Sequence, residues 1–235
     1  MKLYGHPWST NARKVMVAVA EKGHRLDVEV LHIPRGEHKA PAHLALHPFG
    51  KIPVLDDQGF VIYEAAAILR YLDEVLDGPA LWPSTPRERA RALQWDRVHQ
   101  SYFEPVVGPF LVQAMFSRHL GFTPDPEVLE RMREALAAAL AATLDPLDRH
   151  LAEAPFLAGE SFSLADITWL PYLEYLDRIG HGEPIHHRPN VAAWFARIAG
   201  RPSWQTVGRS GMQPYHDDAH PDVIAARHGW RDAAA

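Results

Sequence analysis

The sequence predicts an α/β domain followed by an all-helical domain, on three observations. Two short apolar strands, separated by an Asp-Gln-Gly turn, run directly into a helix between Val54 and Leu72. A strand, a helix and a second strand follow one another between Lys2 and His32, the pattern of a right-handed parallel βαβ unit. After a proline-rich link the chain becomes rich in Ala, Leu, Glu and Arg, which favour helix.

The expected domains are 1–77 (α/β), 87–207 (all-helical) and 208–235 (a C-terminal extension). The order expected in the first domain is β-α-β-(α)-β-β-α, with elements at 2–4, 9–22, 25–32, 40–46, 54–56, 60–63 and 64–72. In the second domain we expect helices at 87–118, 126–153, 164–179 and 191–199, with a short one after Pro202. Pro105, Gly108 and Pro109 should kink the first of these.

Composition excludes several function classes. With 235 residues, 47% of them hydrophobic, and a net charge of −5, the chain can bury a large core and has no basic excess, so no nucleic-acid partner is expected. The absence of cysteine removes disulfides, thiolate metal sites and a cysteine nucleophile, and fits a cytoplasmic protein. No segment approaches the roughly 18 apolar residues that cross a bilayer, so no membrane partner is expected.

Several polar residues lie where a strand or loop meets a helix. Ser163 and Asp166 have the spacing of a capping box, whose role is structural. Ser9 begins the first helix, where it is either an N-cap or a hydroxyl that donates to a bound anion. Glu64 begins the helix after the hairpin, where an acidic residue is an ordinary partner of the helix dipole.

Ile52, followed by Pro53 just before the strand expected at 54–56, can present its backbone to a peptide ligand.

Together these segments resemble the glutathione transferase family. The resemblance is carried by HPFGKIPVL at 47–55, YEAAAILRYL at 63–72 and SLADIT at 163–168, and covers the chain from about Lys2 to Val207. It implies a thioredoxin-like N-terminal domain and a C-terminal helical bundle. The text YGHPWS at 4–9, followed by GEHK at 36–39, is most similar to the phi class and its bacterial relatives, which use a serine hydroxyl.

The resemblance implies a glutathione site. Ser9 becomes the catalytic donor, which favours the glutathione thiolate for attack on an electrophile. The remaining glutathione contacts implied are His38, Lys39 and Lys51 near the glycine carboxylate, Ile52 with a cis Pro53 along the cysteinyl unit, and Glu64 with Ala65 at the γ-glutamyl end. The family usually has serine where this chain has Ala65, so one donor to the γ-glutamyl carboxylate is missing, which would weaken glutathione binding.

An acceptor site for a hydrophobic electrophile is expected from aromatic and apolar residues, whose alternative role is core packing. They are Pro7, Trp8, Phe103, Phe110, Met115, Phe116, Trp169 and Tyr172.

Conjugation, peroxidase and dehalogenase chemistry are all compatible with the resemblance, and the alternative is a non-catalytic member of the family that binds a ligand or a protein. The family also implies a homodimer, in which Phe49 is either a knob inserted in the partner or a core residue. No metal is expected; His216, Asp217, Asp218 and His220 in the extension are a weak candidate set, and Tyr215 or Trp230 could shape the acceptor site.

Overall fold

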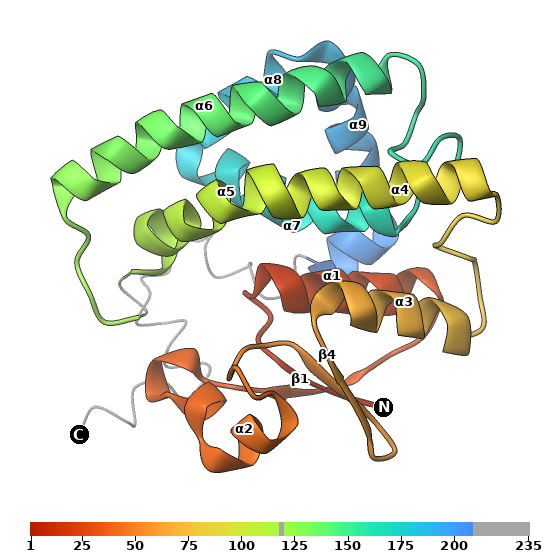
Figure 1. Cartoon of the computed structure of the whole chain (residues 1–235), viewed down its shortest axis with the longest axis vertical. Helices are drawn as coiled ribbons and strands as arrows, with labels where there is room; N and C mark the ends of the chain where they lie inside the picture. The colour runs from red at the N-terminus through yellow and green to blue at the C-terminus, as the bar shows by residue number, and fades with distance from the viewer. Residues whose placement is uncertain (118–119, 209–235) are drawn as a thin grey trace. The chain divides into compact units, whose positions relative to one another are not determined.

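The computed structural model describes residues 1–117 and 120–208, which form two compact units (Figure 1). The first unit contains residues 1–79, 120–121 and 202–208, and the second contains residues 80–117 and 122–201. Residues 202–208, which the sequence interpretation placed with the helical domain, thus group with the α/β unit. The extension from residue 209 onward lies outside the described residues.

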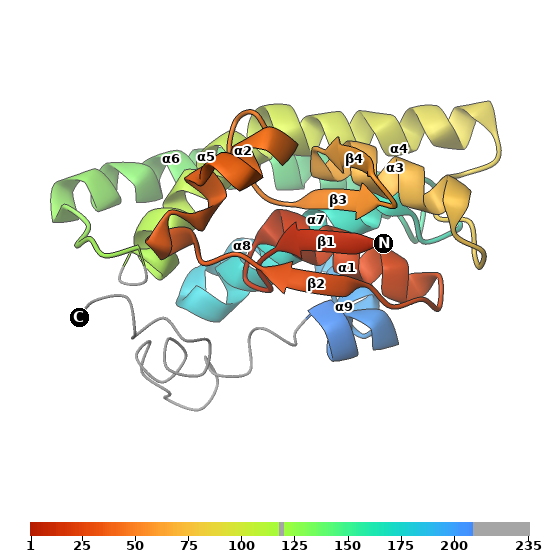
Figure 2. The same cartoon turned by 90° about the horizontal axis from the view of Figure 1, so that it is seen from below.

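A four-stranded mixed sheet forms the first unit, with the strand order β2-β1-β3-β4 (Figure 2). The strands are β1 (Lys2–Gly5), β2 (Asp27–Val30), β3 (Val54–Asp57) and β4 (Phe60–Tyr63). Strand β1 is parallel to β2 and antiparallel to β3, so that Leu3 is opposite Val28 on one side and Leu55 on the other. Both the parallel βαβ unit and the hairpin predicted from the sequence are confirmed.

The hairpin turn has the backbone that a tight two-residue connection requires. Gln58 and Gly59 both have positive φ, at 52° and 94°, which is the signature of a type I′ turn. This turn matches the right-handed twist of β3 and β4 and fixes their register, in which Asp57 is opposite Phe60. The chain then passes directly from β4 into the helix that begins after Glu64.

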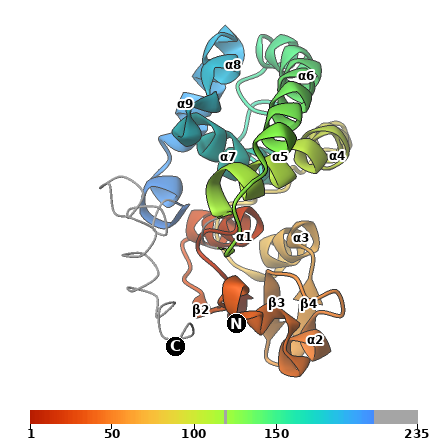
Figure 3. The same cartoon turned by 90° about the vertical axis from the view of Figure 1, so that its left-hand side faces the viewer.

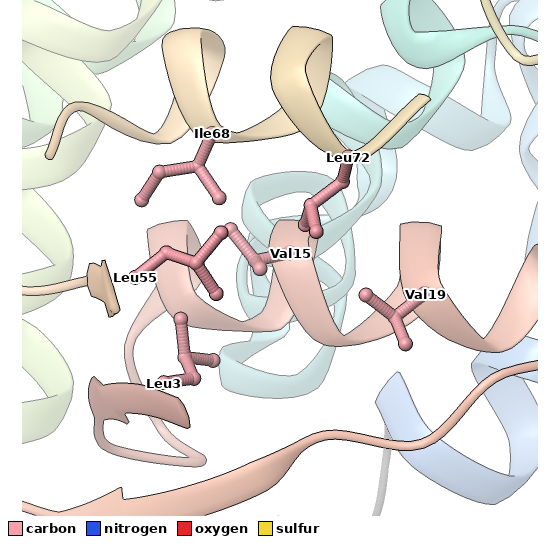
Figure 4. Packing of buried hydrophobic residues seen from close by; sticks show 6 residues of the cluster. All are labelled: Leu3, Val15, Val19, Leu55, Ile68 and Leu72. Carbon is pink, nitrogen blue, oxygen red and sulfur yellow. The ribbon is translucent and has the colours of Figure 1, made fainter. Parts of the chain in front are cut away.

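Two helices, α1 (Thr10–Glu21) and α3 (Ala65–Val75), cover one face of this sheet, while α2 (Pro41–Leu46) lies on the other side, next to β4 (Figures 1 and 3). Val15 and Val19 on α1, and Ile68 and Leu72 on α3, are each one helical turn apart and therefore face the same way. With Leu3 and Leu55 of the sheet they form a buried cluster (Figure 4). This core fixes the two helix N-termini to the sheet.

The last described turn, Trp204–Gly208, also packs on α1. The Arg13 guanidinium lies 4.3 Å from the centre of the Trp204 ring, a distance at which the cation and the ring attract. Ser203 also donates a hydrogen bond to Glu21 at the far end of the helix. The short helix expected after Pro202 is therefore present.

The second unit is all helical. Its helices are α4 (Pro86–Val98), α5 (Glu104–Leu111), α6 (Pro126–Leu151), α7 (Leu164–Leu176), α8 (Glu183–His186) and α9 (Pro189–Ala199). Every residue of α7 is buried, as expected of a helix that is apolar all round, and α4, α5 and α9 pack against it. The predicted capping box begins α7: the Asp166 carboxylate accepts from Ser163 N–H at 2.8 Å. No helix of the described ranges has the length and apolarity needed to cross a bilayer.

The first long helix expected in this unit breaks earlier than predicted. Helix α4 ends at Val98 and is followed by a π-helical turn, His99–Phe103, before α5 begins. Pro105 has no N–H to give to the preceding turn, so the helical ladder widens just before it. A second π-helical turn, Val112–Phe116, follows α5, and the short helix α8 was not predicted.

Candidate glutathione site

Ser9 lies between β1 and α1 and is the N-cap of that helix. Its Oγ accepts a hydrogen bond from Ala12 N–H at 3.3 Å, and its own N–H donates to His6 O at 2.9 Å, which closes the turn made by His6, Pro7 and Trp8. The His6 ring also accepts from Trp8 N–H at 3.1 Å, so the approach to the helix is fixed by side chain and backbone together. The N-cap role suggested by the sequence is confirmed.

The backbone of Ile52 is open to a ligand. Ile52 lies before β3, which begins at Val54, and the peptide bond between Ile52 and Pro53 is cis, as the resemblance implied. Within residues 1–117 and 120–208, neither the N–H nor the C=O of Ile52 makes a hydrogen bond. Such a strand edge can pair with an extended peptide.

Glu64 begins α3 with an unusual backbone. Its φ of 69° and ψ of 115° lie outside the regions that residues other than glycine normally occupy. Its side chain does not cap the helix, and no other side chain in residues 1–117 and 120–208 accepts a hydrogen bond from the Ala65 N–H. Backbone strain of this kind, typically about 1–3 kcal/mol, is concentrated at ligand-binding sites.

The basic residues expected near the glycine end of glutathione surround the segment before Ile52. His38 is partly buried, and burial lowers its pKa, with a further lowering from the Lys39 and His43 charges. Lys39 is exposed, but its Nζ donates to Phe49 O at 2.8 Å, while Lys51 is exposed to solvent. The structure thus brings all three to one loop region, and Phe49, 64% exposed, is not a core residue.

Two residues that sequence reasoning did not select also hold this region. His43 Nε2 lies 2.8 Å from Lys51 O, and the His47 ring stacks on Tyr63 with ring centres 4.5 Å apart. Burial lowers the pKa of His47, although the nearby Glu64 carboxylate opposes this shift. The available signal was their four-residue spacing, with His43 on α2 and His47 directly after that helix.

Most of the residues expected at the acceptor site lie in the cores of the two units. Phe103, Phe110, Trp169 and Tyr172 are buried within the second unit, and Trp8 is buried in the first, edge-on to His6. Pro7, Met115 and Phe116 keep exposed surface. Tyr172 also donates a hydrogen bond to Glu104 at 2.6 Å, beside the buried His99.

The described part of the chain contains no group of three or more His, Asp or Glu side chains arranged to hold a metal ion. The candidate set at His216, Asp217, Asp218 and His220, together with Tyr215 and Trp230, lies outside the described residues.

Comparison with known proteins assigns both units to one protein family. Residues 1–74 match the family model for the glutathione S-transferase N-terminal domain, and residues 126–197 match that for the C-terminal domain. Glutathione S-transferase F9 of Arabidopsis thaliana is 34% identical over 213 residues, covering 89% of this chain and 97% of the relative. Glutathione S-transferase 3 of Zea mays is 37% identical over 219 residues, covering 91% and 96%.

Solved structures agree. Glutathione transferase F7 from Populus trichocarpa superposes with a TM-score of 0.80 at 32% identity, covering 88% of this chain and 97% of that one. Glutathione S-transferase I from maize, solved with an atrazine–glutathione conjugate, gives a TM-score of 0.77 at 29% identity, covering 88% and 95%. The chain therefore belongs to the glutathione S-transferase family and is related to its phi class.

Proposed function

We propose that this protein transfers glutathione to a hydrophobic electrophile and that the Ser9 hydroxyl favours the reactive thiolate. The observation that carries the proposal is the hydrogen bond at the N-cap of α1. Ser9 Oγ uses a lone pair to accept from Ala12 N–H, so its own hydrogen remains available for donation to a ligand. A donated hydrogen bond and the positive end of the α1 dipole both favour a thiolate.

The mechanism needs no general base beside Ser9, because the serine is not the nucleophile. A free thiol has a pKa of about 8.5, and only the thiolate attacks efficiently. Stabilising the thiolate lowers this pKa and raises the reactive fraction at neutral pH. The thiolate sulfur then bonds to the electrophilic carbon, and the leaving group departs with the bonding electron pair.

Glutathione is proposed to lie along the open backbone of Ile52, as an added strand does. Its glycine carboxylate would be near His38, Lys39 and Lys51, and its γ-glutamyl amino group near Glu64. The N–H of Ala65 at the start of α3 would meet the γ-glutamyl carboxylate. The open N–H and C=O of Ile52 and the uncapped start of α3 support this arrangement.

The acceptor is proposed to be an apolar, planar electrophile. Of the apolar candidates in the helical unit, Met115 and Phe116 keep exposed surface and are the proposed contacts. The Phe116 ring packs edge-on against the buried Tyr175, with ring centres 5.4 Å apart. The atrazine conjugate named for the maize enzyme supports an aromatic acceptor. Peroxidase and dehalogenase reactions would use the same thiolate.

The protein is further proposed to be a cytoplasmic homodimer that takes part in detoxification. The exposed Phe49 side chain supports a role as a knob in the partner subunit. Exposed aromatic side chains are enriched at the centres of protein interfaces.

A second candidate function is non-catalytic binding of apolar ligands or a protein on the same fold, which Ala65 favours because it removes one expected donor. Calorimetric titration of glutathione into the protein, followed by a conjugation assay with an activated aryl halide, separates the two. Saturable binding with turnover supports the transferase. Absence of binding at millimolar glutathione would favour the second function.

A further inference from the structure

The three residues before Ile52 are held to the segment 38–47 by four hydrogen bonds. Phe49 N–H donates to His47 Nδ1 (3.3 Å), Gly50 N–H to His47 O (2.8 Å), Lys39 Nζ to Phe49 O (2.8 Å) and His43 Nε2 to Lys51 O (2.8 Å). Both backbone polar groups of Phe49, the N–H of Gly50 and the C=O of Lys51 therefore have partners in this segment.

Gly50 is required by the same arrangement. Its φ is +56°, and an added Cβ would lie 2.7 Å from His38 O and 2.9 Å from Lys39 Nζ. The Lys39 side chain thus passes directly over Gly50 on its way to Phe49 O. The loop is built around these contacts and has no room for a larger residue.

His43 is the member of this set that is least easily explained by packing alone. It lies on α2 and is only 5% exposed. A carbonyl oxygen can only accept, so the hydrogen must be on Nε2, and Nδ1 is then an acceptor. Nδ1 is buried and has no hydrogen-bond partner within the described residues, so the one hydrogen bond of this ring is spent on Lys51 O.

That hydrogen bond acts on Ile52 through the geometry of the peptide group. The Lys51 C=O and the Ile52 N–H belong to one planar trans peptide, in which the two groups point in opposite directions. Fixing the carbonyl therefore fixes the direction of the N–H. This N–H makes no hydrogen bond within the described residues, and it belongs to the backbone edge proposed for glutathione.

We propose that His43 is a positioning residue, which aims the Ile52 N–H at the ligand backbone by holding the Lys51 carbonyl. The inference rests on the proposed function, since glutathione is the ligand that Ile52 would meet. His43 acts on binding and not on the thiol, because its hydrogen bond is to the peptide group and not to Ser9.

The test compares His43→Phe, which keeps a ring but cannot donate, with His43→Gln, whose amide nitrogen can take the place of Nε2. We expect His43→Phe to raise the Kd for glutathione about tenfold, as loss of one well-placed hydrogen bond does. Turnover at saturating glutathione and the pH profile should stay unchanged. His43→Gln should remain within about twofold of the parent protein. Leu44→Ala, on the exposed side of the same helix, is the control.

An unchanged Kd in His43→Phe, or a His43→Gln variant as weak as His43→Phe, would overturn the proposal. A purely structural role would lower the melting temperature of both variants without this difference in Kd. The NMR amide resonance of Ile52 in the glutathione-free protein gives a second measurement: it should shift in His43→Phe and stay in place in His43→Gln. If the parent protein fails to bind glutathione, the proposed function fails, whereas the amide resonance still tests the hydrogen bond.

Discussion

Lys22 Nζ and Asp73 Oδ1 form an ion pair of 3.1 Å in which both side chains are almost fully buried. Lys22 lies at the end of α1 and Asp73 on α3, and the same ammonium donates to Asp73 O at 3.0 Å and to Pro79 O at 3.2 Å. The Lys22 ammonium thus joins the ends of two helices to Pro79, where the segment 1–79 of the first unit ends. Gly78, with φ +115°, lies so close to the backbone of Lys22 that an added Cβ would be 2.5 Å from Lys22 O.

Removing one member of this pair should strongly destabilise the protein. We expect Lys22→Met to lower the free energy of unfolding by about 3–5 kcal/mol, because it leaves a buried carboxylate without its cation. The double variant Lys22→Met/Asp73→Leu should recover part of the loss, since no buried charge remains. Urea denaturation measures both, and a double variant less stable than Lys22→Met would contradict this account.

Asp148 of α6 caps α9, whose own N-cap residue, Arg188, makes no side-chain cap. Its carboxylate accepts from Asn190 N–H at 2.9 Å and Val191 N–H at 3.0 Å. Asp148→Ala should therefore lower the free energy of unfolding by about 1–2 kcal/mol. Asp145, one turn earlier, pairs with Arg188 at an exposed site, so Asp145→Ala should change it by less than about 1 kcal/mol. Equal losses in the two variants would exclude the capping role.

Much of the fold was predictable from local signals. The Asp-Gln-Gly turn between apolar strands gave the hairpin, and the Ser163 and Asp166 spacing gave the start of α7. The π-helical turn at His99–Phe103 was not predictable, because its position depends on how the helical ladder relaxes around Pro105 within a packed bundle.

The candidate site was predictable only in part. Ser9 and Glu64 could be selected because each stands where a strand meets a helix, and Ile52 because Pro53 follows it just before a strand. The contacts of His43 and His47 could not, because they form only when α2 folds back on the loop at 49–51. The burial of Phe103 and Trp169 was equally hidden, since an aromatic residue on a helix has the same pattern in a core and at a ligand site.

Restoring the missing hydroxyl next to Glu64 should strengthen glutathione binding. Ala65→Ser would return a donor to the γ-glutamyl carboxylate, and a hydrogen bond to a charged group contributes about 1.5–3 kcal/mol. We therefore expect the Kd for glutathione to fall by at least tenfold in a calorimetric titration. Ala66→Ser, one position along the same helix, is the matched control and should leave the Kd unchanged. An Ala65→Ser variant with the parent Kd would place the γ-glutamyl carboxylate elsewhere.

Acid should destabilise the protein through the histidines whose pKa is lowered by burial. Burial lowers the pKa of His47 below the 6.5 of an exposed histidine, so the unfolded chain binds a proton first as the pH falls. The stability is therefore fully present above pH 6.5 and is lost as the pH falls from there through the lowered pKa. Burial also lowers the pKa values of His38, His150 and His181, so these histidines add to the same loss of stability in acid.

The variant His47→Asn isolates one of these histidines, because asparagine can still accept from Phe49 N–H but does not titrate. Its free energy of unfolding should fall less between about pH 7.5 and about pH 5.5 than that of the parent protein. An equal fall in both proteins would show that His47 does not contribute to the pH dependence.

The central claim, that Ser9 stabilises the glutathione thiolate, is tested most directly by a pH titration of thiolate absorbance in the glutathione complex. The parent protein should show a thiol pKa well below the value of about 8.5 for a free thiol. In Ser9→Ala this pKa should return toward 8.5 while the Kd for glutathione changes little. Ser9→Thr, which keeps the hydroxyl and the N-cap, should behave as the parent does. The same lowered pKa in Ser9→Ala and in the parent protein would contradict the role proposed for Ser9.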